Sequence, residues 1–308
     1  MGTPESAVPS LRRLVDDGHE IVAVWTQPDK PSGRGKKIHQ SPVKEFGRQH
    51  NLTIHQPQKI KTADAKELFA GHNADVAVVV AYGKILPPEF LTAPTHGCIN
   101  LHFSLLPKYR GAAPVNWAIA NGEQETGVTT MKIVAELDAG SILLQKTTKI
   151  DSEETAPALM SRLARMGAEL TSETLRNINR IEPKPQLASE ATFAPILKRE
   201  DGLIDWSMDS FAIERRVRAF QPWPNAFTHF RSQRLIIWNA TSEWIEQLRH
   251  PAGQVIEISH ERLIVACGNG TALRLFEVQP QDSRRMSARD FVNGTRLTVG
   301  DVLGSELS

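Results

Sequence analysis

Three polar side chains in the middle of this sequence have the types and spacing to stabilise a developing negative charge and to move a proton. Asn100 and His102 lie two residues apart in the apolar run GCINLHF, and Asp138 ends the next apolar run along the chain. Because side chains alternate along a strand, Asn100 and His102 are predicted to face the same way. An amide and an imidazole can donate hydrogen bonds to a carbonyl oxygen that gains charge, and a carboxylate can orient the imidazole or hold a water that relays protons.

The same residues also have ordinary interpretations. Asn-X-His alone fits two hydrogen-bonded core or loop residues, and an Asp before Ala139-Gly140 fits a common turn. Open α/β sheets, however, keep their ligand crevices at the carboxyl ends of parallel strands, where this pair is expected. The three residues together therefore favour a catalytic site.

Two loops next to these residues are predicted to form the walls of a slot for a flat heterocycle. The first contains Ser104, Leu105, Leu106 and Pro107; the second contains Tyr82, Gly83, Ile85 and Leu86. Backbone groups would supply the polar contacts, and the aliphatic side chains would form the walls. The alternative for the first loop is a simple strand exit with a buried leucine pair.

Positive charge is concentrated in the segment 29–48. Its basic residues are Lys30, Arg34, Lys36, Lys37, Lys44 and Arg48, against two acidic ones. The core PSGRGKK lacks the GxxxxGK[ST] spacing of a Walker phosphate loop. It fits either a solvated loop or a contact to a nucleic-acid backbone.

The elements that must position these residues alternate between helices and strands. Helices are predicted in PESAVPSLRRLVDDG, after the N-cap pair Ser41-Pro42, and over 156–178. Strands are predicted in EIVAVWTQ, ADVAVVVAYG, GCINLHF and GVTTMKIVAELDAG. This alternation predicts an α/β domain over 1–180 with a Rossmann-like, open and mostly parallel sheet.

The second half of the chain has a different residue pattern from the first half. Residues 181–200 contain prolines and mixed polarity, and we interpret them as a linker. Several short strand patterns follow, including two runs joined by Gly-Asn-Gly, which is a hairpin signal. A small β-rich domain is therefore predicted over 201–308, with a barrel as one arrangement.

The first residues raise an expectation about the start of the chain. Gly2-Thr3-Pro4 makes a good turn into a helix, and in a doubly wound sheet such a turn follows the first, central strand. A buried strand with about four large aliphatic side chains contributes roughly 6–12 kcal/mol, comparable with a domain's net stability of ~5–15 kcal/mol. The natural chain is therefore expected to carry such a strand upstream of Met1.

Composition narrows the class of protein. The 308 residues are 40% hydrophobic and 23% charged, with a net charge of +1. No run of ~18 apolar residues predicts a membrane span, and a basic-then-apolar leader is absent. Cys98 and Cys267 lie far apart with no metal-ligand spacing, which favours a reducing cytoplasm and no metal.

Several blocks together resemble methionyl-tRNA formyltransferases, along essentially the whole chain. They are GTPESAVPSL, TQPDKPSGRGKKIHQSPVK, VVVAYGKILP, GCINLHFSLLPKYRGAAPVNWAIANGEQETGVTTMK, LDAG, IDWS and RAFQPWPNAF. The Asn-X-His-X-Ser-Leu-Leu-Pro block with Leu-Asp-X-Gly is similar to the wider family that uses 10-formyltetrahydrofolate. The GRGKK insertion and the C-terminal part are similar to the member that acts on tRNA.

The resemblance implies a Rossmann-like catalytic domain and a C-terminal barrel similar to an OB fold. It implies a monomeric enzyme with 10-formyltetrahydrofolate as co-substrate and initiator methionyl-tRNA as substrate. It further implies that Asn100, His102 and Asp138 are catalytic and that Ser104 to Pro107 bind the folate. By the same resemblance Arg34, Lys36 and Lys37 contact the acceptor stem, and Lys198 and Arg199 form a basic linker that contacts tRNA.

This chain departs from the family pattern at three places. Family members usually have Gly in place of Glu136 and a small residue in place of Phe103, and they carry a strand before MGTPE. Two other functions stay open from the sequence. One is a formyltransferase or hydrolase for a small molecule, and the other is a non-catalytic RNA-binding protein with a vestigial site.

Overall fold

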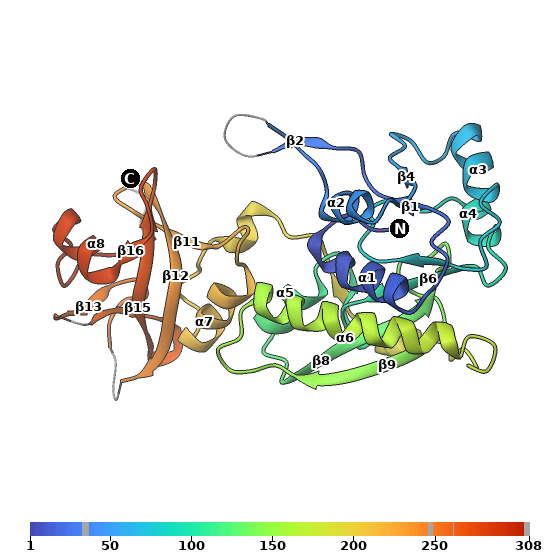
Figure 1. Cartoon of the computed structure of the whole chain (residues 1–308). Coiled ribbons are helices and arrows are strands. Elements are labelled where there is room, and N and C mark those ends of the chain that lie inside the picture. Colours follow the sequence, from blue (N-terminus) through green and yellow to red (C-terminus); the bar gives the residue numbers. More distant parts are fainter. Residues whose placement is uncertain (33–36, 246–248, 261, 305–308) are drawn as a thin grey trace. The chain divides into compact units, whose positions relative to one another are not determined.

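The computed structural model describes residues 1–32, 37–245, 249–260 and 262–304 (Figure 1). The chain divides into two compact units, each assembled from separate stretches. Unit 1 comprises Met1–Pro114, Glu125–Lys149 and Met160–Pro195; unit 2 comprises Val115–Gln124, Ile150–Leu159 and Ile196–Ser308.

A four-stranded sheet positions the candidate residues in unit 1. Its strands, in spatial order, are β5 (Ala77–Val79), β6 (Cys98–His102), β8 (Glu125–Lys132) and β9 (Ile142–Lys149). β5 and β6 are parallel, whereas β8 is antiparallel to β6 and β9 is antiparallel to β8. The sheet is therefore mixed, and the prediction of mostly parallel strands needs this correction. The short connection between β8 and β9 accounts for the direction of β9, since a parallel crossover needs a dozen or more residues.

Smaller strand pairs complete unit 1. β1 (Val24–Trp25) pairs parallel with β4 (Ile54–His55), and β2 (Lys30–Ser32) pairs antiparallel with β3 (Lys37–His39). β7 (Arg110–Gly111) pairs parallel with β10 (Phe193–Ala194). This last pair attaches the end of the segment read as a linker to the loop that follows β6.

The sequence predicted only the helices that begin near residues 5–8, 42 and 156, whereas the described part of the chain up to residue 190 forms eight helical segments. They are η1 (Glu5–Ala7), α1 (Val8–Asp16), α2 (Pro42–Gln49), α3 (Ala63–Ala70), α4 (Pro88–Thr92), α5 (Pro114–Ala120), α6 (Ala156–Arg176) and η2 (Ala188–Glu190). Ser41 caps α2, since its hydroxyl accepts from the Lys44 amide at 3.2 Å, and Pro42 is the first helical residue. Thr62 caps α3 in the same way.

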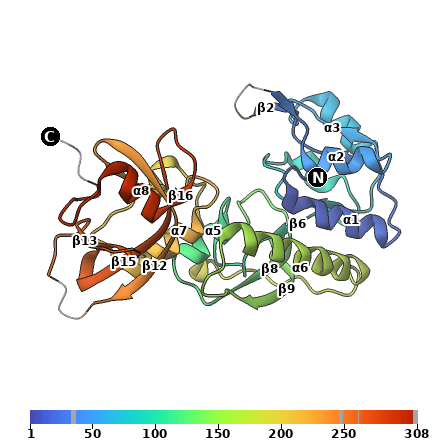
Figure 2. The ribbon, with the colours of Figure 1, turned by 60° about the vertical axis from the view of Figure 1, so that its left-hand side comes forward.

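The long helix α6 determines which way the strand β6 faces. In unit 1, α6 runs along β8 and β9 in both views (Figures 1 and 2). A Cβ added at Gly167 of α6 would lie 2.6 Å from the Leu101 side chain, so Leu101 faces this helix. Because side chains alternate along the strand, Asn100 and His102 face away from α6.

Unit 2 is rich in β structure, as predicted. It contains η3 (Arg199–Gly202), α7 (Ser210–Ala219), β11 (Ala226–Phe230), β12 (Gln233–Trp244), β13 (Val255–Ile258), β14 (Leu263–Ala266), η4 (Gly268–Gly270), β15 (Thr271–Pro280), β16 (Met286–Ser287) and α8 (Ala288–Thr295). The antiparallel sheet has the order β11-β12-β15-β14-β13, with β16 beside β15. The predicted Gly-Asn-Gly hairpin joins β14 to β15, with Asn269 in the left-handed region at φ 57°.

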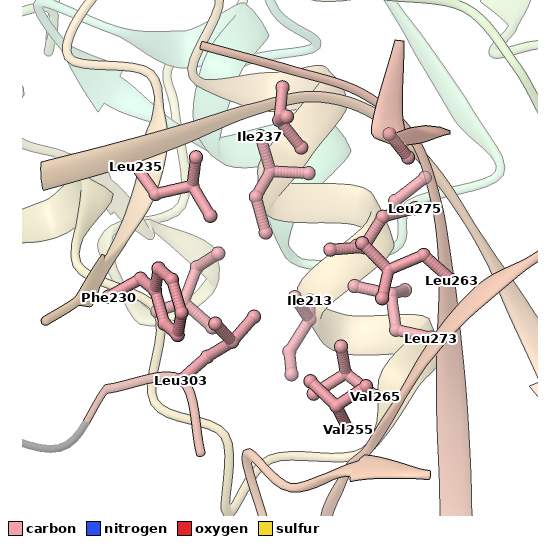
Figure 3. Packing of buried hydrophobic residues seen from close by; sticks show 14 of the residues in the cluster. Ile213, Phe230, Leu235, Ile237, Val255, Leu263, Val265, Leu273, Leu275 and Leu303 are labelled. Carbon is pink, nitrogen blue, oxygen red and sulfur yellow. The ribbon is translucent and has the colours of Figure 1, made fainter. Parts of the chain in front are cut away.

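The core of unit 2 lies between this sheet and α7 (Figure 3). Ile213 of α7 is buried in the same cluster as Leu235 and Ile237 of β12 and Leu273 of β15. Among the strands that the structure describes, β11 and β13 are the two ends of the sheet and do not pair, so no closed barrel is found. The barrel expected from the resemblance is thus not observed.

Candidate active site

His102 is held rigidly at the end of β6. Its side chain is only 6% exposed, and Nε2 lies 2.9 Å from the carbonyl oxygen of Tyr109. Because a carbonyl oxygen can only accept a hydrogen bond, Nε2 carries the ring hydrogen and is the donor. The other nitrogen, Nδ1, lies 3.8 Å from Oδ2 of Asp138.

Burial determines the charge state of His102. It lowers the pKa of the imidazole, while the Asp138 carboxylate and the Tyr109 carbonyl act in the opposite direction with smaller effect. A neutral ring with its proton on Nε2 presents an acceptor, Nδ1, toward a second acceptor, Oδ2 of Asp138. A group with two hydrogens to donate, such as an amine or a water, could contact both atoms from one side.

Asp138 reaches the histidine from the connection between β8 and β9. Its backbone is left-handed at φ 49°, and Oδ2 accepts a hydrogen bond of 2.9 Å from the Gly111 amide. Position 111 requires a glycine, because its φ is 123° and a Cβ there would lie 2.5 Å from the carbonyl oxygen of Ala194. The structure therefore brings two of the three predicted catalytic residues together.

Asn100 lies on the same strand and the same face as His102. It is half-buried and opposes Val79 of β5 and Met131 of β8 in the sheet register. Within the described part of the chain, its side-chain amide has no hydrogen-bond partner. The amide is therefore free to donate to a ligand next to His102.

Sequence reasoning missed two residues of this region, Arg110 and Gln186. The Arg110 side chain is only 4% exposed, its Nε donates to Oε1 of Gln186 at 3.0 Å, and its Nη1 lies 3.3 Å from Oε1 of Glu136. Arg110 is visible in the sequence as a basic residue before a glycine. Nothing local indicated that it is buried or that Gln186, 76 residues later, contacts it.

The predicted folate loop is tightly organised by its own hydrogen bonds. The Leu106–Pro107 peptide is cis, and the Ser104 hydroxyl donates to the Lys108 carbonyl at 2.6 Å. Thr129 on β8 accepts from the Leu106 amide and donates to the Ser104 carbonyl, while Gln145 on β9 donates to the Leu106 carbonyl. Ser104 and Leu106 are buried and Leu105 is half-buried, so part of the predicted leucine wall is core.

The second predicted loop divides into core and surface. Tyr82 and Leu86 belong to the core cluster around Trp25, and burial raises the pKa of Tyr82 to about 12. Ile85, in contrast, is 78% exposed. Gln27 fixes the loop by donating to the carbonyls of Tyr82 and Gly83. Of the apolar residues predicted here, Ile85 is the one accessible to a ligand.

The predicted tRNA-binding residues are described only in part. Arg34 and Lys36 lie outside the described residues, and Lys37 is the first residue of β3. Lys198 and Arg199 are exposed in unit 2, at the start of η3. Burial and the charge of Arg199 both lower the pKa of Arg234, which places a third cation near this pair.

Unit 1 contains a cavity of about 290 Å³ whose lining includes Leu14, Val24 and Val78 but none of the candidate catalytic residues. Its lining combines aliphatic side chains with polar ones such as His72 and Asp75, and it lies apart from Asn100, His102 and Asp138. Among the described residues no group of three His, Cys, Asp or Glu side chains could hold a metal ion, and none of their helices is long and apolar enough to cross a membrane.

Comparison with known proteins agrees with this geometry. Residues 1–175 match the family model "Formyl transferase", and residues 196–296 match "Formyl transferase, C-terminal domain". A methionyl-tRNA formyltransferase of Alkaliphilus oremlandii is 45% identical over 307 residues, which cover 99% of this chain and 98% of the relative. One of Caldanaerobacter subterraneus is 46% identical over 311 residues, covering 98% of each.

Solved structures show the same fold at lower identity. The N-formyltransferase of Helicobacter canadensis, solved in complex with folinic acid and dTDP-3-aminofucose, superimposes with a TM-score of 0.65. The match covers 91% of this chain and 97% of that one at 18% identity. From the two family matches and the full-length relatives together, the chain belongs to the formyl transferase family.

Proposed function

We propose that this chain transfers the formyl group of 10-formyltetrahydrofolate to the α-amino group of methionine on initiator tRNA, in the initiation of translation. The full-length relatives named for this activity support the proposal. The observation that carries it is the approach of His102 to Asp138, 3.8 Å apart, on the side of β6 that also bears Asn100.

The chemistry forms one bond and breaks one. The methionine amine attacks the formyl carbon, a new C–N bond forms, and the bond from that carbon to N10 of the folate breaks. The amine loses a proton and N10 gains one. Asn100 would donate to the oxygen that becomes negative in the tetrahedral intermediate.

His102 and Asp138 have a defined part in this scheme. Because the neutral imidazole already donates from Nε2 to Tyr109, it has a second N–H for the oxyanion only after Nδ1 is protonated. An attacking amine that contacts both Nδ1 and Oδ2 would give its proton to this pair, which would then pass it toward N10. The imidazolium formed in that way would hydrogen-bond the oxyanion, and Asp138 would stabilise its charge.

The folate is proposed to lie against the two loops predicted for it. Ser104, Leu105, Leu106 and Pro107 would form one wall of that site. Tyr82, Gly83, Ile85 and Leu86 would form the other, with Tyr82 and Leu86 acting as its support because they are buried. The structural relative bound to folinic acid supports only the fold that such a site requires.

The tRNA is proposed to contact basic residues in both units. Arg34, Lys36 and Lys37 would contact it from unit 1, and Lys198 and Arg199 from unit 2. In unit 2, Arg234 stacks on Phe227 at 4.1 Å and donates to the Pro224 carbonyl, next to Trp223, which is 54% exposed. Cations beside an exposed aromatic ring suit a phosphate backbone with unpaired bases.

The proposal also covers the roles of the domains, the oligomeric state and the cellular location. We assign catalysis to 1–180, a connecting role to 181–200, and tRNA binding to 201–308, with an OB-like arrangement of the last. The family matches at 1–175 and 196–296 support a division of this kind. The enzyme would act as a monomer in the cytoplasm, where translation begins.

A turnover assay with a choice of acceptors tests the proposal. Purified protein is incubated with 10-formyltetrahydrofolate and either methionyl initiator tRNA, methionyl elongator tRNA, free methionine or an amino sugar nucleotide. Formyl transfer to the charged initiator tRNA, far above the other acceptors, is the expected result. Transfer only to a small acceptor, or tRNA binding without turnover, would exclude the proposed activity.

A further inference from the structure

We propose that Gln186 is a positioning residue that holds the Asp138 loop in register with the loop after β6. The inference rests on the proposed function and adds a residue to it. Gln186 lies in the segment 181–200, which from sequence alone was read only as a linker. In the structure this part of the segment belongs to unit 1.

One side chain joins the two loops through three hydrogen bonds. Nε2 of Gln186 donates to the carbonyl oxygens of Asp138, at 2.8 Å, and Gly140, at 2.7 Å. Its Oε1 accepts from Nε of Arg110 at 3.0 Å. Both amide hydrogens and the amide oxygen are therefore used.

These partners also fix the orientation of the amide. If nitrogen and oxygen were exchanged, the oxygen would face two carbonyl oxygens and the NH₂ would face a guanidinium N–H. All three contacts would become repulsive, because carbonyls only accept and the guanidinium only donates. The two ends of the Gln186 amide thus have separate functions that substitution can separate.

Two further contacts between described residues also connect the two loops. Asp138 accepts from the Gly111 amide, and Glu136 pairs with Arg110. The Glu136 side chain is 76% exposed, so this pair is weak in water. Without Gln186, the alignment would depend, among these contacts between described residues, on this exposed pair and on the hydrogen bond that the catalytic carboxylate itself forms.

Thr192, the residue before strand β10, also holds the loop after β6. Thr192 accepts from the Tyr109 amide through its hydroxyl and from the Arg110 amide through its carbonyl. The Tyr109 carbonyl is in turn the partner of His102. Residues 186–194 therefore fix both the imidazole and the carboxylate, and Gln186 is the contact specific to the carboxylate loop.

Two substitutions and a matched control test the proposal. Gln186→Met keeps the size and removes all three hydrogen bonds, while Gln186→Glu keeps the acceptor for Arg110 and removes both donors. Gln279→Met is the control: in unit 2, its oxygen accepts from Trp238 Nε1 at 2.9 Å and its nitrogen donates to the Ser283 carbonyl at 2.9 Å. Both glutamines are half-buried.

Two independent readouts are measured. Both Gln186 variants are expected to lose about 10–100-fold in kcat with KM for 10-formyltetrahydrofolate changed by less than about twofold, since displacing reacting groups by ~1 Å costs up to this much. The second readout is the pKa of His102 by NMR, assigned with a His102→Gln variant. It should fall in Gln186→Met, because the carboxylate that raises it is held less closely. Gln279→Met should change neither.

The outcomes distinguish a failure of the positioning role from a failure of the proposed function. A Gln186→Glu enzyme with wild-type kcat, or a His102 pKa unchanged in Gln186→Met, would overturn the positioning role. If the wild-type protein formylates no acceptor, the proposed function fails. In that event the NMR readout still decides whether Gln186 positions Asp138.

Discussion

The region around His102 in unit 1 and the region around Arg199 in unit 2 are built in opposite ways. His102 and Arg110 are almost fully buried and take partners from the 138–140 connection and from residue 186. Lys198 and Arg199 are exposed, and the Lys198 amide donates to nearby Asp201 at 2.6 Å. The first region depends on convergence of distant segments, and the second depends on local charge.

The difference shows what each task requires. A reaction centre needs donors fixed within tenths of an ångström in a site shielded from water, where electrostatic interactions are strong. A phosphate backbone is long and uniformly charged, so exposed cations on flexible side chains suffice. Single substitutions should therefore have steep effects in the first region and graded ones in the second.

The largest effect is expected at the oxyanion donors. Asn100→Ala and His102→Ala should each lower kcat by about 10²–10³-fold, the usual loss for one such donor, with folate binding largely kept. Single-turnover formylation and folate binding by fluorescence would measure the two quantities. His19→Ala, which removes an exposed histidine of unit 1, is the control. Near-normal turnover in either variant would contradict the assignment and remove the contrast between the regions.

A smaller, salt-dependent effect is expected in unit 2. Arg199→Ala should raise KM for tRNA while kcat and the folate KM stay unchanged. The slope of log affinity against log salt should become shallower by about 0.7–0.9 if one phosphate contact is lost. Titrations of tRNA at several salt concentrations measure the slope, with the exposed Arg289 of α8 changed to Ala as the control. Equal slopes in both variants and the wild type would place the tRNA elsewhere.

The smallest effect is expected on the stability of unit 1, which should depend on pH through two of its histidines. Burial lowers the pKa of His55 and of His72, and their mutual repulsion lowers that of His72 further. The unfolded chain therefore binds more protons in acid, so stability present above the ordinary histidine pKa of ~6.5 is lost as pH falls through the lower folded values. Protonation of His72 would also remove the acceptor for Trp25 Nε1, 3.2 Å away.

Melting curves between neutral and mildly acidic pH check this expectation. His72→Gln supplies a side-chain oxygen that can accept from Trp25 and does not titrate. Its melting temperature should fall by a few degrees less than that of the wild type as the pH is lowered. His19→Gln, at an exposed position, should follow the wild-type curve. Parallel curves for all three proteins would show that the half-buried pair His55 and His72 does not contribute.

Local patterns in the sequence were sufficient for the elements and for part of the site. Periodicity and capping signals located α2, α6 and β6, and the Gly-Asn-Gly hairpin was recognised from its turn residues. Alternation along β6 was enough to place Asn100 and His102 on one face. These features depend on residues within a few positions of each other, and the physical rules that govern them are therefore readable along the chain.

Only the tertiary structure decided how these parts combine. The antiparallel β8 and β9, the burial of Tyr82 and Leu86, and the open sheet of unit 2 each depend on what packs against them. The proton on Nε2 of His102 depends on the Tyr109 carbonyl. The positions of Arg110 and Gln186 depend on a contact across 76 residues. Burial and hydrogen-bond partners are properties of the packed chain, and no local pattern in the sequence contains them.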